Sequence, residues 1–519
     1  MNKKAFAGLF FLSLLAASFF RLSGLSLRPM HHDEANQALK FGTLLEHGEY
    51  RYDKQDHHGP SLYYLTLPFA QIFGQNTLVS LSERSLRFVP AFFGLATVLL
   101  LLLFLPALGR PAVFWSALGL ALSPIMTYFS RFYIQEILLV FFVTGFMAFL
   151  WRYAMRPSWG WALAAGIFAG MMYATKETAV IAFGATAVAL PISLLLSKKP
   201  PQREVASRKP RTAHLLLGLA AALLTALVLF TSFFQNPKGF LDSLLTFRVY
   251  FVRAAERGFH VHPWYYYFQV LAFSKAAGRL LWSEAFILVL AAAGSIAAFR
   301  TRPSDPPQPA VLKFIFFYTL AATAAYSFIP YKTPWNVLPF YIGFILLAGS
   351  GAAVILNACR NKIGRTLVLL LFLAGFVNLS VADYRANFVF PADPANPYVY
   401  AQTSPDFMKL ISRIEDLASL DPEGTKMLIK VIASPHETWP LPWYLRGFER
   451  VGYWTSSEET GEIDAPPLII SSAEEAGKLE SSLKDLYVSE YYGLRPEVFL
   501  VLHVREDLWQ KFLKSRDLS

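Results

Sequence analysis

The chain is poor in charged residues and has almost no cysteine. Only 16% of its 519 residues are Asp, Glu, Lys or Arg, whereas soluble domains have about 25%. This composition excludes a soluble protein. Cys359 is the one cysteine in the sequence, so cysteine supplies neither an internal disulfide nor a metal site.

Apolar residues predominate instead. Hydrophobic residues make up 55% of the chain, and they gather in runs of about 17 to 23 residues, long enough to cross a hydrocarbon core about 30 Å thick. The first run is too long for a cleaved signal peptide, and we expect it to be retained. A shorter stretch, 61–73, favours an interfacial or re-entrant position. About eleven spans are predicted, near 5–23, 88–105, 112–128, 135–151, 160–175, 178–196, 213–234, 283–299, 313–329, 335–356 and 366–382.

Basic residues orient these spans. With the N-terminus inside, the inner connections hold seventeen bases and only two acids, Glu204 and Asp305, which is a strong positive-inside pattern. The bases are Lys3, Lys4, Arg110, Arg152, Arg156, Lys198, Lys199, Arg203, Arg208, Lys209, Arg211, Arg300, Arg302, Lys313, Arg360, Lys362 and Arg365. We expect a multi-pass protein of the inner cell membrane with a cytoplasmic N-terminus. The net charge of +11 then reflects topology and does not indicate nucleic-acid binding. The basic run 198–211 is interpreted first as a solvated loop, with contact to anionic membrane lipids as the lesser alternative.

An odd number of spans places the tail outside the cell. Residues 383–519 have 14 Lys and Arg against 22 Asp and Glu, a net charge of −8, whereas 1–382 has 33 against 14, a net charge of +19. The shift predicts a helical polytopic membrane domain, 1–382, followed by a small extracytoplasmic α/β domain, 383–519. In the tail we expect helices at 404–420 and 472–486, and strands at 426–432, 467–470 and 498–504.

The densest polar sequence is the first outer loop, 24–87. Its first part, 31–34, reads His-His-Asp-Glu and precedes a predicted helix over 33–47, and its second part holds His57 and His58. Three interpretations stay open for the acids Asp33 and Glu34. In the first, one of the two acids acts as a general base. In the second, both acids bind a metal together with the histidines. In the third, they cap the helix that follows.

Other outer connections add cations. Arg131 and Glu136 lie between the third and fourth spans, Lys176 between the fifth and sixth, and Lys332 between the ninth and tenth. Each alone is typical of an interfacial anchor. Together they would place Arg and Lys beside a carboxylate cluster on one membrane face, as binding of a lipid-linked phosphate requires.

These motifs carry a family resemblance. Asp33-Glu34 after the first span and the segment 130–136, Ser-Arg-Phe-Tyr-Ile-Gln-Glu, resemble the protein O-mannosyltransferases and lipid A aminoarabinose transferases of the GT-C superfamily, although Glu136 stands where an Asp is usual. A resemblance over nearly the whole chain is to the prokaryotic flippase-activity-associated family, which is GT-C-like. It is carried by 31–35, 56–60, 331–335, 400–406, 439–446 and 492–496.

The resemblance implies an inverting glycosyltransferase. A sugar would pass from a polyprenyl-phosphate donor to a hydroxyl of a glycan, lipid or protein acceptor on the extracytoplasmic face. Asp33 would be the base, with Glu34 supporting it, and Glu136 would orient Arg131 or help to bind a divalent metal. Arg131, Lys176 and Lys332 would hold the donor phosphate, and His57 and His58 would line the acceptor side.

Two points stay open at the level of sequence. Whether a metal takes part is unknown, and its candidate ligands are Asp33, Glu136 and His32. A non-enzymatic factor that assists translocation of lipid-linked glycans would share the membrane bundle without needing Asp33 as a base. A secondary transporter is disfavoured because the sequence has no internal repeat and its acids crowd one face.

Overall fold

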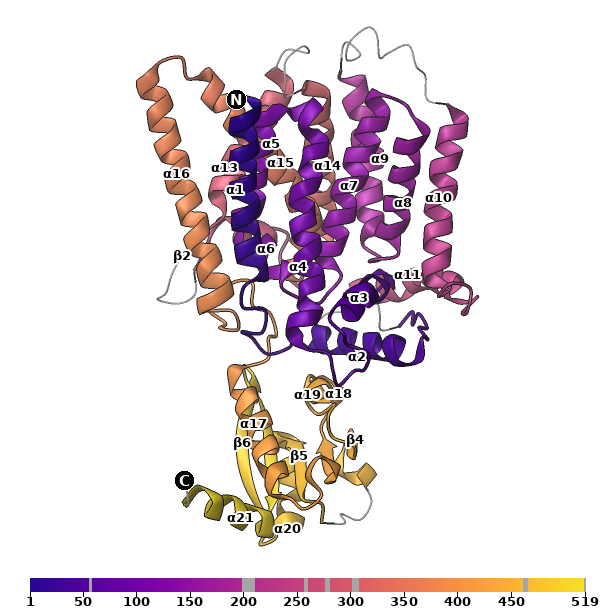
Figure 1. Ribbon diagram of the computed structural model, residues 1–519, viewed down its shortest axis with the longest axis vertical. Helices are drawn as coiled ribbons and strands as arrows, with labels where there is room; N and C mark the ends of the chain where they lie inside the picture. The colour runs from indigo at the N-terminus through magenta and orange to yellow at the C-terminus, as the bar shows by residue number, and fades with distance from the viewer. Residues whose placement is uncertain are drawn as a thin grey trace.

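The computed structural model describes residues 1–519 except 56–57, 198–210, 256–259, 276–280, 301–307, 461–464 and 518–519. It is a bundle of long, roughly parallel helices with a small sheet-containing domain at one end (Figure 1). The predicted helical membrane architecture with a C-terminal α/β part is confirmed.

Each predicted span overlaps one of the long helices. The helices are α1 (Lys3–Leu22), α4 (Glu83–Leu100), α5 (Leu105–Leu122), α7 (Glu136–Met155), α8 (Trp159–Tyr173), α9 (Ala179–Leu195), α10 (Thr212–Phe230), α13 (Ala285–Arg300), α14 (Pro309–Phe328), α15 (Leu338–Ala358) and α16 (Lys362–Tyr384). Among the described residues, seven segments are long and apolar enough to cross a membrane, one of them being Glu83–Leu122, which holds both α4 and α5. Two shorter apolar helices are α9 and α13.

One predicted span is misplaced. The third was expected at 112–128, but α5 ends at Leu122. Ser123 accepts a hydrogen bond from the Met126 N–H and caps a new helix, α6 (Pro124–Ser130), which has proline in its first turn. The apolar run therefore continues through a break between two helices.

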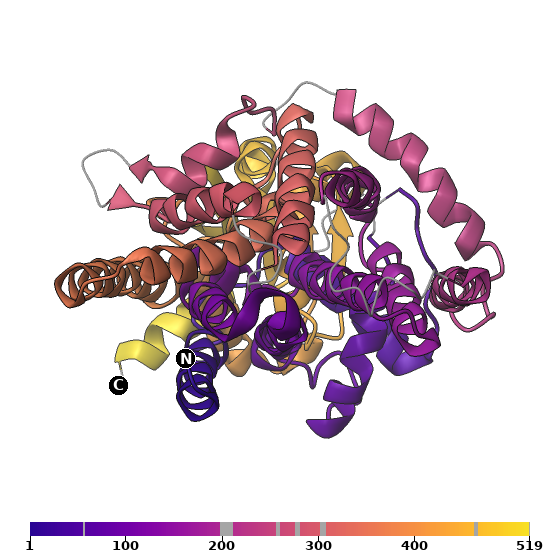
Figure 2. The same cartoon turned by 90° about the horizontal axis from the view of Figure 1, so that it is seen from above.

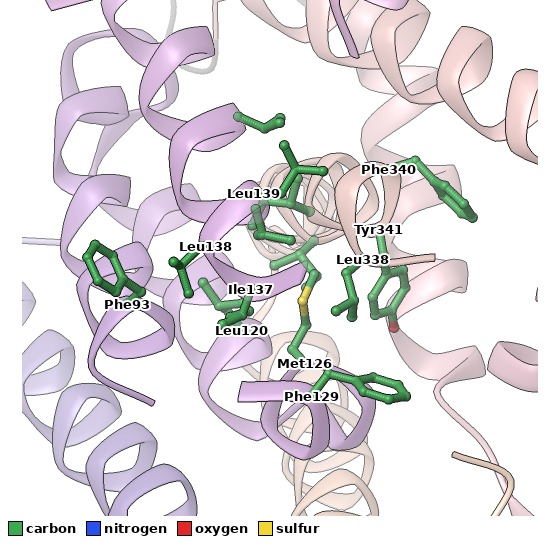
Figure 3. Packing of buried hydrophobic residues seen from close by; sticks show 14 of the residues in the cluster. Phe93, Leu120, Met126, Phe129, Ile137, Leu138, Leu139, Leu338, Phe340 and Tyr341 are labelled. Atoms are coloured by element: carbon green, nitrogen blue, oxygen red, sulfur yellow. The ribbon is translucent and has the colours of Figure 1, made fainter. Parts of the chain in front are cut away.

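The bundle is packed most tightly around α15. Ideal Cβ atoms on Gly294 and Gly351 would lie 2.0 Å from the carbonyl oxygens of Leu347 and Leu290, so α13 and α15 approach closely only because these residues are glycines. Figure 3 shows large apolar side chains from α5, α6, α7 and α15 filling the centre. They include Leu120, Met126, Phe129, Ile137, Leu138, Leu338 and Tyr341, all at most 1% exposed.

Further helices cover the end of the bundle next to the C-terminal domain. They are α2 (His32–His47), α3 (Ser61–Ile72), α11 (Gly239–Ala255) and α12 (Tyr266–Ala272). The predicted helix over 33–47 is α2, and the apolar stretch 61–73 forms α3, whose 12 residues are too few for a span. Viewed from above, α11 lies along the end of the bundle while α10 is seen end-on (Figure 2).

The C-terminal part is built on a five-stranded mixed sheet. Its strand order is β4 (Val451–Trp454), β3 (Ile429–Ile432), β5 (Leu468–Ser472), β7 (Val498–Arg505), β6 (Tyr487–Arg495). The main helices are α17 (Pro405–Leu420), α20 (Ala473–Leu483) and α21 (Glu506–Asp517), and short helices α18 (Pro435–Thr438) and α19 (Leu441–Tyr444) face the bundle (Figure 1). All five predicted elements are present, and the two edge strands were not predicted.

The N-terminus and the α15–α16 connection lie at the end of the bundle opposite the C-terminal domain (Figure 1). Lys3, Lys4, Arg360 and Lys362 are therefore far from the first-loop acids. The polar residues expected to carry chemistry lie instead at the end that α2 and the C-terminal domain share.

Candidate active site

Asp33 lies in the first turn of α2, which His31 caps. The Nδ1 atom of His31 accepts the Asp33 N–H at 3.0 Å, and Nε2 lies 3.0 Å from the Tyr400 carbonyl oxygen. Because a carbonyl only accepts, Nε2 must carry the ring proton, and Nδ1 is left as the acceptor that caps the helix. The Asp33 side chain is 44% exposed. Among the described residues, the one histidine, lysine or arginine side chain within 4 Å of the Asp33 carboxylate is the His31 ring, at 3.7 Å.

Glu34 is held in the opposite way. It is fully buried, and both of its oxygens accept bonds of 2.7 Å from the Arg87 guanidinium. It also accepts the N–H groups of His31 and Tyr133 at 3.0 and 2.9 Å. Burial alone would raise the pKa of Glu34, but Arg87 and Arg28 lower it to about 2. Glu34 is therefore a fixed anion that anchors α2 and thereby positions Asp33.

Arg28 and Arg87, which the sequence analysis did not single out, organise the first loop. Arg87 donates to the carbonyl oxygens of Leu25, Arg28 and Pro29 at 2.8 to 3.0 Å. The Arg28 guanidinium lies 3.7 Å from Glu34 and 3.5 Å from the centre of the Phe132 ring. An arginine in the first turns of a span, 53 positions from its acid, gave no local signal of this pairing.

Arg131 is placed differently from the role expected for it. Its guanidinium donates to the carbonyl oxygens of Phe20, Ser23 and Gly24 at 2.8, 2.5 and 2.7 Å, and the residue is 3% exposed. These bonds close the C-terminal end of α1, where helix carbonyls lack partners within the helix. Arg131 thus fixes the fold beside the site, and its fork of donors is directed at the backbone.

Glu136 pairs with Lys176 and not with Arg131. The Lys176 Nζ atom lies 2.5 Å from Glu136 Oε1 and 3.5 Å from Asn336 Oδ1. Both members of the pair are nearly buried, at 5% and 3% exposed. The start of α7, the α8–α9 connection and the segment after α14 meet at this ion pair.

His58 is brought to the same connection. It lies 2.8 Å from Glu177, which also accepts a bond from Tyr52 at 3.1 Å. The chain can approach here because residue 59 is glycine: an ideal Cβ on Gly59 would lie 2.2 Å from the Ala174 carbonyl oxygen. Two residues further along the chain, the Ser61 N–H donates a hydrogen bond to the same oxygen at 2.9 Å. His57 lies outside the described residues.

Lys332 holds two outer segments together. Its Nζ donates to the carbonyl oxygens of His262 and Ile329 at 3.0 and 2.5 Å, and the residue is 1% exposed. Burial lowers its pKa. Most of its donor capacity is spent on the backbone.

Aromatic side chains connect Asp33 to the Lys176 pair. The Trp335 ring contacts the rings of His31 and Tyr400 at 5.9 and 5.7 Å between centres, and its neighbour Asn336 contacts Lys176. The Tyr400 hydroxyl is hydrogen-bonded to His260, which interacts electrostatically with Asp33. Trp335 and Asn336, neighbours in the chain, thus contact His31 beside Asp33 on one side and Lys176 on the other.

The C-terminal domain supports the same loop. Gln402 and Thr403 donate to the carbonyl oxygens of Pro29 and Met30 at 2.9 and 2.7 Å, and the Tyr444 hydroxyl accepts the Met30 N–H at 2.9 Å. The Trp439 ring stacks on His32 at 5.6 Å. The sequence motifs 400–406 and 439–446 therefore form the junction between the tail and the loop that carries Asp33.

The candidate metal ligands do not assemble into a recognisable set. His32 stacks on Trp439, and Glu136 is paired with Lys176. Over the described part of the chain, no group of three or more His, Cys, Asp or Glu side chains is placed to hold an ion.

Comparisons with known proteins agree with this architecture. Residues 13–236 match the family model of the dolichyl-phosphate-mannose-protein mannosyltransferases. ArnT from Cupriavidus metallidurans, in its structure bound to undecaprenyl phosphate, has a TM-score of 0.62 at 15% identity, covering 98% of this chain and 99% of that one. Its apo structure gives 0.61 at 16% identity, covering 97% and 99%.

A more distant structure shares the fold. The archaeal oligosaccharyltransferase AglB from Archaeoglobus fulgidus, in complex with an inhibitory peptide and a dolichol-phosphate, has a TM-score of 0.55 at 13% identity, covering 98% of this chain and 77% of that one. No curated protein matches the sequence. The predicted relation to the GT-C-type enzymes is confirmed: the chain has the fold of the GT-C-type membrane glycosyltransferases, and its N-terminal part matches the dolichyl-phosphate-mannose-protein mannosyltransferase family.

Proposed function

We propose that the chain transfers a sugar from a polyprenyl-phosphate donor to an acceptor hydroxyl, with inversion, on the extracytoplasmic face of the membrane. The observation that carries this function is the contrast within the first-loop pair. Asp33 is 44% exposed and, among the described residues, has no lysine or arginine side chain within 4 Å, while Glu34 next to it is buried and bound by Arg87. A free carboxylate on a rigidly anchored helix end is what a general base requires.

Asp33 accepts the proton of the acceptor hydroxyl as the hydroxyl oxygen forms a bond to the anomeric carbon. Attack comes from the face opposite the phosphate, and the bond between that carbon and the phosphate oxygen breaks. Its electron pair leaves with the polyprenyl phosphate, and the configuration at the carbon inverts.

Lys176 is the group best suited to the leaving phosphate. Its ammonium is held by Glu136 and Asn336, so it is oriented without being covered by backbone carbonyls. A positioned cation of this kind stabilises charge on a departing phosphate. Arg131 and Lys332 act as anchors of the surrounding segments, and His58, fixed by Glu177, is assigned to the acceptor side.

Both membrane neighbours were solved with a polyprenyl phosphate, undecaprenyl phosphate on ArnT and dolichol-phosphate on AglB. This supports a donor of the same chemistry here. A glycan, lipid or protein acceptor would approach from the side of the C-terminal domain. We place the protein in the inner cell membrane with its N-terminus in the cytoplasm.

The function is tested with purified protein in nanodiscs, labelled polyprenyl-phosphate monosaccharides and a panel of glycan, lipid and peptide acceptors. We expect label in at least one acceptor, with the opposite anomeric configuration from the donor. If no acceptor is labelled while the protein moves lipid-linked glycans across liposome membranes, the translocation-factor alternative replaces the enzyme.

A further inference from the structure

A groove of about 500 Å³ lies along the C-terminal end of α16 and the turn that follows the helix. On the helix its lining includes Val377, Val381 and Tyr384, which share one face because they are four and three residues apart. Beyond the helix, Val389 and Phe390 continue the lining. These side chains give the groove mainly apolar walls.

The groove opens toward the membrane lipid. In two views α16 lies at the edge of the bundle (Figure 1; Figure 2), and its apolar residues Leu370, Leu371, Val377 and Val381 are exposed. The helix coincides with the predicted span 366–382, so these side chains face acyl chains. Because the groove lies at the end of α16 nearest the C-terminal domain, the predicted topology places it in the outer leaflet.

Arg385 lies at the end of the groove, just beyond the predicted span. The residue is half-buried and contributes to the lining. Among the described residues, no group accepts a hydrogen bond from its guanidinium and no acid lies within 4 Å of it. The carboxylate nearest in sequence, Asp383, is buried and accepts a bond from Asn387 at 2.7 Å. An arginine at this depth places its charge at the level of the lipid phosphates.

The lining favours one class of lipid. It holds one cation, Arg385, and no acid. The hydroxyl of Ser380, which also lines the groove, donates to the Phe376 carbonyl oxygen at 2.8 Å. A guanidinium binds a phosphate strongly, but the lining offers no carboxylate to a headgroup that carries an amine. The charge of the groove therefore complements an anionic headgroup better than a zwitterionic one.

We propose that an anionic phospholipid of the outer leaflet binds in this groove. Its phosphate is held by Arg385, and one acyl chain packs along Val377, Val381 and Val389 through close van der Waals contact. The site lies on the lipid-facing side of α16, and the inference goes beyond the proposed function without depending on it.

A lipid bound here would stabilise the junction between α16 and α1. In the turn after α16, the Phe388 ring lies 5.8 Å from the Phe19 ring and 6.3 Å from the Phe20 ring, between centres. The Arg131 guanidinium lies 4.9 Å from the centre of the same Phe388 ring. A ligand that binds only the folded protein raises its stability, so the lipid should raise the melting temperature.

The test measures lipid binding to the purified protein in detergent by native mass spectrometry. Phosphatidylglycerol, phosphatidylcholine and phosphatidylethanolamine with the same acyl chains are compared. Arg385→Gln removes the cation, and Val381→Trp fills the groove while keeping the cation. The matched controls are Arg365→Gln, an exposed arginine at the other end of α16, and Leu370→Trp, an exposed position outside the groove. Melting temperatures without lipid establish that all variants fold.

Wild-type protein should bind phosphatidylglycerol more tightly than the other two lipids and should melt at a higher temperature with it. Arg385→Gln and Val381→Trp should each weaken that binding about tenfold, the loss typical of one charge-assisted contact, while both controls bind as wild type does. Equal loss in the controls, or no preference for phosphatidylglycerol, would overturn the inference and leave the proposed function standing. Displacement of phosphatidylglycerol by an equal amount of undecaprenyl phosphate would assign the groove to a polyprenyl lipid and also overturn it.

Discussion

At the scale of single residues, the acids Asp33 and Glu34 are neighbours in sequence and opposites in environment. Glu34 is fully buried against Arg87, and the Asp33 side chain is 44% exposed. The helix-cap interpretation therefore applies mainly to Glu34, which accepts the His31 N–H in the capping box. That leaves Asp33 free for chemistry.

The buried pair gives stability a defined pH dependence. The pKa of Glu34 is about 2 in the folded protein against an ordinary 4.5. Its ionised form therefore stabilises the fold above pH 4.5, and this contribution, about 3 kcal/mol, is lost as the pH falls from 4.5 to 2. Glu34→Gln should lower the melting temperature at pH 7, and the gap to wild type should narrow below pH 4.5. Thermal unfolding in detergent across this range measures it, and a gap independent of pH would contradict the assignment.

Substitutions of Arg131 and of Lys176 should have different effects, the first on stability and the second on donor binding. Arg131→Lys loses the fork that bonds to three backbone carbonyls at the end of α1, so the melting temperature should fall while the folded fraction keeps its affinity for polyprenyl phosphate. The double variant Lys176→Gln/Glu136→Gln removes the cation without leaving a buried charge unpaired, and it should weaken that affinity about tenfold or more. The reverse pattern would restore Arg131 as the phosphate ligand.

At the scale of elements, the first loop and the α8–α9 connection meet where a side chain does not fit. Gly59→Ala would place a methyl group 2.2 Å from the Ala174 carbonyl oxygen. The loop must then withdraw, taking His58 away from Glu177. We expect reduced thermal stability and reduced activity. Gly160→Ala, where nothing lies within 4 Å of the added carbon, is the matched control. If both alanine variants behaved alike, close packing at Gly59 would not matter.

Prediction of elements from the sequence succeeded where burial imposes a simple pattern. The apolar spans and the buried strands β3, β5 and β7 are recognisable because one kind of side chain fills them. The edge strands β4 and β6 are mostly half-buried, with buried and exposed residues mixed, and were missed.

The same limit applies to the site. The acidic pair, Glu136 and Lys176 were found from local sequence. Their partners were not, because Arg87 lies 53 positions from Glu34 and Asn336 lies 160 from Lys176. Only the packing of helices far apart in the chain brings these groups together. The change in composition near Asp383, by contrast, was recognisable from the sequence. It coincides with the end of α16 at Tyr384.

At the scale of the whole molecule, the two ends of the bundle differ in their charged residues and in the elements that cover them. We predict that the end bearing α2 and the C-terminal domain faces outward, because the basic N-terminus and the basic α15–α16 connection, both predicted to be inner, lie at the other end (Figure 1). Reporter fusions after Leu196 and after Ser519 should give opposite readouts in cells, the first cytoplasmic and the second external. Two readouts on the same side would refute this topology.

The C-terminal domain completes the support of the loop that carries Asp33. Thr403 and Tyr444 bond to the backbone of Met30, next to the His31 cap. The helix bundle and the C-terminal domain thus both support the segment that carries Asp33, which we propose to be the base.

The most direct measurement is sugar transfer by Asp33→Asn, made beside donor affinity and melting temperature. The change keeps the size of the side chain and removes the proton acceptor. We predict a loss of transfer of about 10²- to 10⁴-fold, with the affinity for polyprenyl phosphate and the melting temperature unchanged. Transfer near the wild-type rate at equal stability would contradict the account and eliminate Asp33 as the base.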